Sequence, residues 1–395
     1  MNILIVTNMF PPITTGSSHY AEDLAMVLHE RGHNVTVVTV MLDIETPKDT
    51  HCPFNVIRLS SIHLKLKGFN WFTATSHNPI NYFRLAGLIK KYDIDVVHQI
   101  NHYLDTAIVT RVVCGLMNIP YVVSIHTQLQ FRPKIYTPVL RFLDKIISGH
   151  LVLRGSSKII ALDSEVVRYL NDTYGGWLRK GKHNDKVVII PHGIVIDNSR
   201  FPVKTNYELS HTIISIGHVV NVRNRLNLIK AMKVVVSEFP NMKLEIIGHV
   251  YTKEPHKLIK ELGLEKNVYL TGEKTHTDTI NKLKEADIHA VWLNLNYVGM
   301  GTAVQESMLC GVPVINNSPE NLYGDTELKN MRDIVLIDQN NVQEIADKII
   351  LLVKNKELRK SIGENGRSYI IKNLDINIIA GRIENVYLSL AREKG

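Results

Sequence analysis

Two glycines and one carboxylate mark a stretch of the chain that could bind a polar ligand. In "GMGTAVQES", Gly299 and Gly301 precede an apolar helix that carries Glu306. A glycine turn before a helix exposes backbone N–H groups at the positive end of the helix dipole, which suits phosphate or sugar oxygens. Glu306, about one turn into the helix, could accept hydrogen bonds from both hydroxyls of a ribose. A tight strand-to-helix turn and a surface acid are the structural alternatives.

Two further glycine turns stand between a strand and a helix. In "PPITTGSSHYAEDL", Gly16 follows the first apolar run, but the full G-x-G-x-x-G pattern of a dinucleotide site is missing. In "SIGHVVNVRNRL", Gly217 and His218 occupy the matching place in the second half, and Arg223 follows. Because a guanidinium binds phosphate oxygens bidentately, His218 and Arg223 are predicted to face a diphosphate. A solvated arginine is the alternative.

Histidines provide a second kind of candidate. His126 ends the apolar run "VVSIH", and the carboxyl ends of parallel strands are where ligands bind in such sheets, so we predict a functional role. The pair His98 and His102 in "HQINH" resembles a metal-binding helix motif, but Gln99 stands where that motif has a glutamate. We therefore predict no metal site. The sequence also contains no nucleophile elbow and no P-loop.

The elements that must position these residues alternate regularly between strand and helix. Apolar runs such as "NILIVT", "HNVTVVTV", "HTIISIGH" and "MKLEIIGH" are separated by amphipathic helical segments, and the plan occurs twice. This alternation predicts an α/β protein with two doubly wound Rossmann-like domains and an interdomain cleft at the carboxyl ends of their strands. The segment Asn198–Ser210 has a proline and no periodicity, so it is the predicted linker. The predicted domains are 1–197 and 198–374.

Length and composition agree with this organisation. A chain of 395 residues that is 45% hydrophobic and 21% charged is predicted to be globular with two domains. Its three widely spaced cysteines favour reduced thiols and a cytoplasmic location. The first apolar run is too short for a signal peptide, and no run approaches the roughly 18 apolar residues of a membrane span.

The charge favours an anionic partner. The chain has a formal net charge of +8 and a pI near 9.1. Nucleic acid is not expected, because no recognisable module or interleaving of basic and aromatic residues is evident. In Phe131–Gly155, five basic residues alternate with apolar ones, as in a helix that lies on anionic lipid, although an ordinary surface helix fits as well. They are Arg132, Lys134, Arg141, Lys145 and Arg154.

Taken in order, these motifs resemble the GT-B-fold retaining glycosyltransferases of the family-four type. The resemblance runs from "ILIVTNMFPPITTGSSHYAEDL" through "VVSIH", "IIPHGIVIDNSRF" and "SIGHVVNVRNRLNLIKAM" to "GMGTAVQESMLCGVPVI". It implies a hexosyltransferase that uses a nucleotide-sugar of UDP or GDP type and needs no metal or other cofactor. The first domain would bind a glycan, lipid-linked or protein acceptor and the second the donor. It also suggests that the last helix, within 375–395, packs back on the first domain.

The resemblance also assigns roles by position. Gly16 and His126 correspond to residues near the reacting sugar, and Glu306 corresponds to the second acid of an E-x7-E motif, which holds the ribose. The implied activity belongs to surface polysaccharide or glycoconjugate assembly, in the cytoplasm or at the inner face of the cell membrane. The implied donor-binding residues are Gly217, His218, Arg223, Gly299, Met300, Gly301, Thr302 and Glu306.

Three positions depart from the family pattern. Val298 replaces the first acid of E-x7-E, His218 replaces an arginine, and His192 replaces an asparagine. The phosphate site is therefore expected to keep one fixed positive charge instead of two. Valine cannot accept a hydrogen bond from a sugar hydroxyl, so sugar choice is expected to be relaxed or changed. The alternative hypothesis is a catalytically impaired GT-B protein that acts as the binding partner of an active glycosyltransferase.

Overall fold

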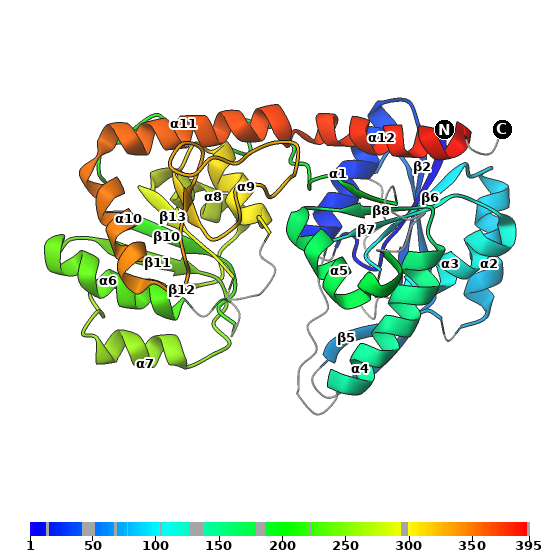
Figure 1. Ribbon diagram of the computed structural model, residues 1–395, viewed down its shortest axis with the longest axis horizontal. Helices are drawn as coiled ribbons and strands as arrows, with labels where there is room; N and C mark the ends of the chain where they lie inside the picture. The colour runs from blue at the N-terminus through cyan, green and yellow to red at the C-terminus, as the bar shows by residue number, and fades with distance from the viewer. Residues whose placement is uncertain are drawn as a thin grey trace. The chain divides into compact units, whose positions relative to one another are not determined.

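The computed structural model describes residues 1–12, 16–41, 52–66, 69–76, 78–102, 105–126, 137–178, 186–220, 223, 225–293 and 299–392 (Figure 1). Val298, and Arg132 and Lys134 of the basic segment, lie outside these residues. The chain divides into two compact units. The first unit comprises Met1–Gly193 together with Ile376–Gly395, and the second comprises Ile194–Asp375.

The first unit is built on a parallel sheet. Its strands lie in the order β3-β2-β1-β6-β7-β8-β9, and each neighbouring pair is parallel. They are β1 (Asn2–Val6), β2 (Asn34–Val40), β3 (Asn55–Leu59), β6 (Val96–Ile100), β7 (Tyr121–Ile125), β8 (Lys158–Ala161) and β9 (Val187–Ile189). β4 (Ile62–Leu66) and β5 (Phe69–Ala74) form a separate antiparallel pair.

Helices flank this sheet. They are α1 (Gly16–Glu30), α2 (Ile80–Lys91), α3 (Asp105–Met117), α4 (Thr137–Asp144), the π-helical segment η1 (Lys145–Leu153), α5 (Ser164–Leu178) and α12 (Ile376–Arg392). α1 is followed by Gly32 at a φ of 88°, the left-handed conformation that ends many helices. α12 packs against α1, so the last helix of the chain completes the first unit (Figure 1).

The second unit has a parallel sheet in the order β12-β11-β10-β13-β14-β15. Its strands are β10 (Thr212–Ile216), β11 (Lys243–Ile247), β12 (Val268–Gly272), β13 (Ile288–Ala290), β14 (Val314–Asn316) and β15 (Val335–Leu336). β11 and β12 are added on one side of β10, and β13, β14 and β15 are then added on its other side. The order therefore reverses between β10 and β13, and the carboxyl ends at such a reversal are where open α/β sheets bind ligands.

Both faces of this second sheet are covered. Ile213 of β10 packs in a core with Met232 and Ile349, whereas the next residue, Ile214, packs in another core with Met308. Because neighbouring strand residues point to opposite faces, two cores mean two helical layers. The helices are α6 (Leu226–Glu238), α7 (Glu254–Glu261), α8 (His276–Glu285), α9 (Thr302–Leu309), α10 (Val342–Lys354) and α11 (Lys356–Asn373). The predicted α/β fold with two Rossmann-like domains is confirmed.

Among the helices of the described ranges, none combines the length and the apolar character needed to cross a bilayer.

Candidate functional site

Two glycine turns lie side by side at the carboxyl end of the second sheet. Gly217 follows β10 with a φ of 122°, and Gly248 follows β11 with a φ of 141°. A β-carbon on Gly248 would stand 2.6 Å from the carbonyl oxygen of Gly217, so only glycine permits this approach. The N–H of Gly217 donates to the carbonyl of Ile247 at 2.8 Å. The backbone segments that follow β10 and β11 are thus packed closely together, with no side chain at either glycine.

Two arginines converge on this turn. Arg223 Nη1 and Arg225 Nη2 lie 3.4 Å and 3.5 Å from the point where a β-carbon on Gly217 would stand. Arg223 is half-buried, whereas Arg225 is only 2% exposed. Burial, and next the charge of Arg223, lower the pKa of Arg225 to about 9. Arg223 was predicted from the sequence, but Arg225 was not, because the resemblance assigned no role to its position, although it lies in the same stretch of the sequence.

Arg225 makes its hydrogen bonds to neutral oxygens. Its Nε donates to Ser215 Oγ at 2.7 Å and its Nη2 donates to the Ile216 carbonyl at 3.0 Å. Nη1 donates to the carbonyl of Arg223 at 3.3 Å. The side chain therefore joins the end of β10 to the backbone that carries Arg223.

His218, the third predicted residue of this turn, points toward the end of β11. Its Nδ1 accepts a hydrogen bond from the backbone N–H of His249 at 3.2 Å, and its ring meets Tyr251 edge-on with 5.9 Å between centroids. The ring is about half exposed. A diphosphate contact for His218 stays a prediction.

The start of α9 presents uncapped backbone N–H groups. Gly301 is the N-cap residue, and no side chain caps the helix. A β-carbon on Gly301 would meet no described atom within 4 Å, and Thr302 is exposed. Gly299 is half-buried, and Met300 is buried in the core with Met308. The first amides of the helix can therefore receive an anion or a sugar oxygen.

Glu306, on the same helix, has a histidine partner. Its Oε1 lies 3.0 Å from Nε2 of His276, the first residue of α8. Glu306 is partly buried and His276 is exposed. The sequence offered no signal for this pair, because thirty residues separate the two side chains.

A buried histidine ties this helix to the sheet. His289 Nδ1 lies 2.6 Å from Ser307 Oγ, and its Nε2 accepts from the Ile216 N–H at 3.3 Å. Ser307 donates its own proton to the Ala303 carbonyl, so His289 must be the donor at Nδ1. Burial, and next Arg225, lower the pKa of His289 to about 3, which agrees with a neutral ring. β10, β13 and α9 are thus connected by one hydrogen-bonded chain.

α11 supports α9 through a close contact between helices. A β-carbon on Gly363 of α11 would overlap the carbonyl oxygen of Gly311, which follows α9. The hydroxyl of Tyr207 donates to that same carbonyl at 2.8 Å. The position of the helix that carries Glu306 therefore depends on a glycine more than fifty residues away.

In the first unit, His126 follows β7 in a cluster of rings that includes the buried Tyr20 and the half-buried His192. Its backbone N–H donates to Asn101 Oδ1 at 3.1 Å, and its ring lies 4.4 Å from that of Tyr20 and 6.0 Å from that of His192. Burial lowers the pKa of His126 well below its ordinary value, and His192 and His98 lower it further. Within the described part of the chain, His126 Nε2 is buried and lacks a hydrogen-bond partner. His126 is thus a neutral imidazole with one ring nitrogen available.

Gly16 is the first residue of α1, the helix that also carries Tyr20. Gly16 is exposed, and the hydroxyl of Tyr20 is buried without a hydrogen-bond partner among the described residues. His192, one of the three departures from the family pattern, packs edge-on against Tyr20 with 4.6 Å between ring centroids. Tyr20 therefore links α1, which begins at Gly16, to His126, and the roles of Gly16 and His126 stay predictions.

The histidines of "HQINH" do not form a helix motif. His98 lies on β6, where its Nδ1 is 2.6 Å from the hydroxyl of Tyr387 on α12 and its Nε2 meets Ser124 Oγ. His102 follows the strand and lies 3.3 Å from the hydroxyl of Tyr174. Across the described ranges, no group of three histidine, cysteine or acidic residues is arranged to hold a metal ion.

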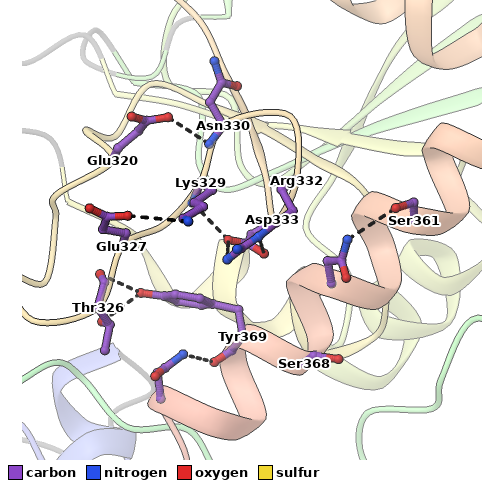
Figure 2. Close-up of polar contacts among 12 residues, drawn as sticks. Glu320, Thr326, Glu327, Lys329, Asn330, Arg332, Asp333, Ser361, Ser368 and Tyr369 are labelled. Atoms are coloured by element: carbon purple, nitrogen blue, oxygen red, sulfur yellow. Dashed lines mark hydrogen bonds and ion pairs between the residues drawn. The ribbon is translucent and has the colours of Figure 1, made fainter.

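A separate polar groove of about 690 Å³ lies between residues 324–333 and α11. Figure 2 shows its main contacts: Asp333 pairs with Arg332 at 2.7 Å and accepts from the Lys329 N–H at 3.0 Å. The hydroxyls of Thr326 and Tyr369 are 3.1 Å apart. Acidic and basic groups are balanced in this groove, and no predicted site residue lines it.

Two family models match consecutive parts of the chain. "Glycosyltransferase Family 4" matches residues 14–198, and "Glycosyl transferases group 1" matches residues 198–369. The first contains Gly16 and His126, and the second contains Arg223 and Glu306.

Individual relatives agree with these matches. The poly(ribitol-phosphate) alpha-N-acetylglucosaminyltransferase of Staphylococcus aureus is 29% identical over 44% of this chain and 35% of its own. The N-acetyl-alpha-D-glucosaminyl L-malate synthase of Bacillus anthracis is 21% identical over 97% of this chain and 96% of its own. The match with the Staphylococcus aureus enzyme and with four further relatives is partial: it spans between 22% and 58% of the relative's own length.

The fold has solved counterparts. HepE from Anabaena, crystallised with UDP, superimposes with a TM-score of 0.73 at 16% identity, over 98% of this chain and 100% of that one. Two parallel-sheet units, two consecutive family matches and this structural likeness lead to one conclusion. The chain belongs to the GT-B glycosyltransferases.

Proposed function

We propose that the protein is a retaining glycosyltransferase that moves a sugar from a UDP- or GDP-type nucleotide-sugar to a glycan, lipid-linked or protein acceptor. The observation that carries this proposal is the uncapped N-terminus of α9, with Glu306 on the same helix. One short element thus offers amides for phosphate or sugar oxygens and a carboxylate for a ribose diol. HepE, the structural relative crystallised in complex with UDP, is consistent with that use.

The donor diphosphate would lie at the Gly217 turn, near Arg223. Transfer breaks the bond between the sugar's anomeric carbon and a phosphate oxygen and forms a bond from that carbon to an acceptor oxygen. Negative charge develops on the leaving diphosphate, which can take up the proton that the acceptor hydroxyl loses. The Arg223 guanidinium and the amides from Met300 to Thr302 would stabilise that charge. The hydrogen bonds of His289 hold β10 and α9 together, so these groups are fixed before the substrate arrives.

His126 would act as a neutral hydrogen-bonding group. Its lowered pKa keeps the ring uncharged at neutral pH, and its Nε2 is the buried atom that lacks a partner within the described residues. It would orient the reacting sugar or the acceptor hydroxyl instead of carrying charge. We assign no protein nucleophile.

Surface polysaccharide or glycoconjugate assembly is the pathway class that the relatives support. The Staphylococcus aureus relative acts, by its name, on poly(ribitol-phosphate), and another relative from that species is named for capsular polysaccharide biosynthesis. A polyanionic or lipid-linked acceptor would also suit the net charge of +8.

Nucleotide binding tests the proposal. Thermal unfolding would be measured with UDP, GDP and ADP for the wild type, Glu306→Ala and the control Glu261→Ala, which removes an exposed acid on α7. At least one diphosphate should raise the unfolding temperature of the wild type and of the control. Glu306→Ala should weaken binding roughly ten- to a hundredfold. A wild type that no nucleoside diphosphate stabilises would contradict the proposal.

The same assay separates the alternative function, an inactive partner of another glycosyltransferase. That alternative predicts no stabilisation by any nucleotide together with co-purification of a second glycosyltransferase. If transfer is observed, the anomeric configuration of the product, read by NMR, decides between retention and inversion.

We also propose that α4 and η1 contact anionic lipid at the inner face of the cell membrane. Phe142 and Ile146 are 64% and 46% exposed, and the exposed basic residues Arg141 and Lys145 alternate with them. Apolar side chains beside basic ones favour an anionic bilayer surface. Phe142→Ser should reduce co-sedimentation with phosphatidylglycerol vesicles. Phe83→Ser, on α2, should not, and equal binding by both variants would contradict the proposal.

A further inference from the structure

We propose that Arg225 is the second fixed positive charge of the diphosphate site and that it positions Arg223. This inference rests on the proposed nucleotide-sugar donor. It adds a residue that the motif resemblance does not assign, and it corrects the expectation of a single fixed charge that followed from His218.

The first argument is the charge itself. The guanidinium of Arg225 is buried, and its hydrogen bonds within the described residues go to neutral oxygens and to no carboxylate. Its undescribed neighbours in sequence, positions 221, 222 and 224, are asparagine, valine and asparagine, so they supply no acid either. An unpaired buried charge is costly to folding. A bound anion would offset that cost, which is what a donor diphosphate offers.

The second argument is convergence. The guanidinium nitrogens of Arg223 and Arg225 both lie within 3.5 Å of one point beside the Gly217 α-carbon. Two like charges held together repel each other, and the pKa of Arg225 is lowered partly for that reason. Their approach becomes favourable once a doubly charged ligand lies against the turn.

The third argument is the backbone. Arg225 has a φ of 59°, in the left-handed region that long side chains rarely adopt, at the N-cap of α6. Such strain persists where the surrounding structure requires it and concentrates at functional sites. This conformation directs the side chain back to the end of β10, where it bonds Ser215 and Ile216.

Arg225 acts as a positioning residue. Its described hydrogen bonds all go to protein oxygens, one of them to the carbonyl of Arg223. It therefore holds the backbone of Arg223 and adds positive potential next to the Gly217 turn. Arg223 and the α9 amides would touch the phosphates. Charge lost at His218 is thus replaced from a position that is seven residues later in the chain.

Calorimetric binding tests this role. The dissociation constant of whichever nucleoside diphosphate binds best, and of its parent nucleoside, would be measured for the wild type, Arg225→Met and Arg225→Lys. Arg359→Met is the matched control, because Arg359 is also buried and donates to the carbonyls of Leu352 and Tyr207, away from the glycine turn.

Arg225→Met should weaken the diphosphate about tenfold or more, and leave the nucleoside unchanged. Arg225→Lys keeps the charge and should retain most of the diphosphate affinity. The control should bind both ligands as the wild type does.

Equal weakening of diphosphate and nucleoside in Arg225→Met would mean a purely structural role and would overturn the inference, as would unchanged diphosphate binding. If Arg225→Met does not fold, the lysine variant decides: affinity lost for both ligands overturns the inference, and affinity kept for both supports it. If the wild type binds no nucleoside diphosphate, the proposed nucleotide-sugar donor is wrong. That result contradicts the proposed function, and it differs from a failure of the Arg225 inference alone.

Discussion

The imidazole of His276 lies 3.0 Å from the carboxylate of Glu306, across the start of α8 and the middle of α9. One carboxylate oxygen is therefore held by His276, and within the described ranges the other makes no hydrogen bond, so it would serve a ligand hydroxyl. His276 orients the group that would hold the ribose.

Replacement of His276 by alanine should raise the KM for the nucleotide-sugar about three- to tenfold with little change in kcat, since a typical net hydrogen bond is worth roughly 1 kcal/mol. Steady-state kinetics would show this. His256→Ala, on the exposed face of α7, is the control. A fall in kcat at constant KM would contradict a role in ribose binding.

Stability should fall on mild acidification. Burial lowers the pKa of His98, His102 and His289 to about 3 and that of His192 to about 4. These rings stay neutral when folded but take up protons when unfolded. Their contribution is therefore complete above an unfolded pKa of about 6.5 and is lost as pH falls toward 4, by up to about 1.4 kcal/mol per pH unit for each ring.

Two acids oppose this trend. Burial raises the pKa of Asp163 to about 6 and also raises that of Asp144, so the folded state holds those protons more tightly. For Asp163 this contribution is lost as pH rises from about 4 through 6. Burial also lowers the pKa of His126, so five histidines outweigh two aspartates, and urea midpoints should be lower at pH 5 than at pH 7. Equal midpoints would show that the rings are protonated in the folded protein.

The contact between α9 and α11 should be intolerant of a single methyl group. Gly363→Ala forces a β-carbon into the carbonyl of Gly311, and overpacking of this kind costs about 1–3 kcal/mol. Gly87→Ala, inside α2, meets no described atom within 4 Å and should stabilise by about 0.5–1 kcal/mol. Thermal unfolding of the two variants should thus shift in opposite directions.

Thiol chemistry should distinguish the three cysteines. Cys52 is partly exposed, whereas Cys114 and Cys310 are buried, and none is in a disulfide. Burial, and next Glu306, raise the pKa of the Cys310 thiol to about 12. Because the thiolate is the reactive form, a disulfide reagent at pH 8 should label Cys52 first and the other two only in denaturant. Cys52→Ser should remove the early reaction, and persistence of that reaction would identify a different exposed thiol.

Periodicity predicted most of the fold. Strands buried on both faces, such as β1 and β10, appear as continuous apolar runs that are hard to mistake. β3 was not predicted, because it is only partly buried and its run is less apolar. The antiparallel pair β4–β5 was also not predicted, and its alternating polar residues carry no buried-strand signal.

The candidate site was predictable only where its residues are close in sequence. Gly301 caps the helix that carries Glu306, so spacing places them together. His289 joins β10 and α9 through contacts between elements far apart in the sequence, which no local pattern records. Arg225 is only two residues from Arg223, but the direction of its side chain follows from the φ of 59° at that position, which the sequence does not reveal. Gly363 and Gly87 look alike as glycines inside helices, and only packing separates them.

The place of α12 has a consequence for biosynthesis. Its Tyr387 reaches into the first unit to bond His98, yet the entire second unit is translated between β9 and this helix. The first unit therefore cannot complete its packing until the second unit and α12 have been synthesised. Until then the surface of the first unit that α12 covers is exposed, and a chaperone has its best opportunity to bind there.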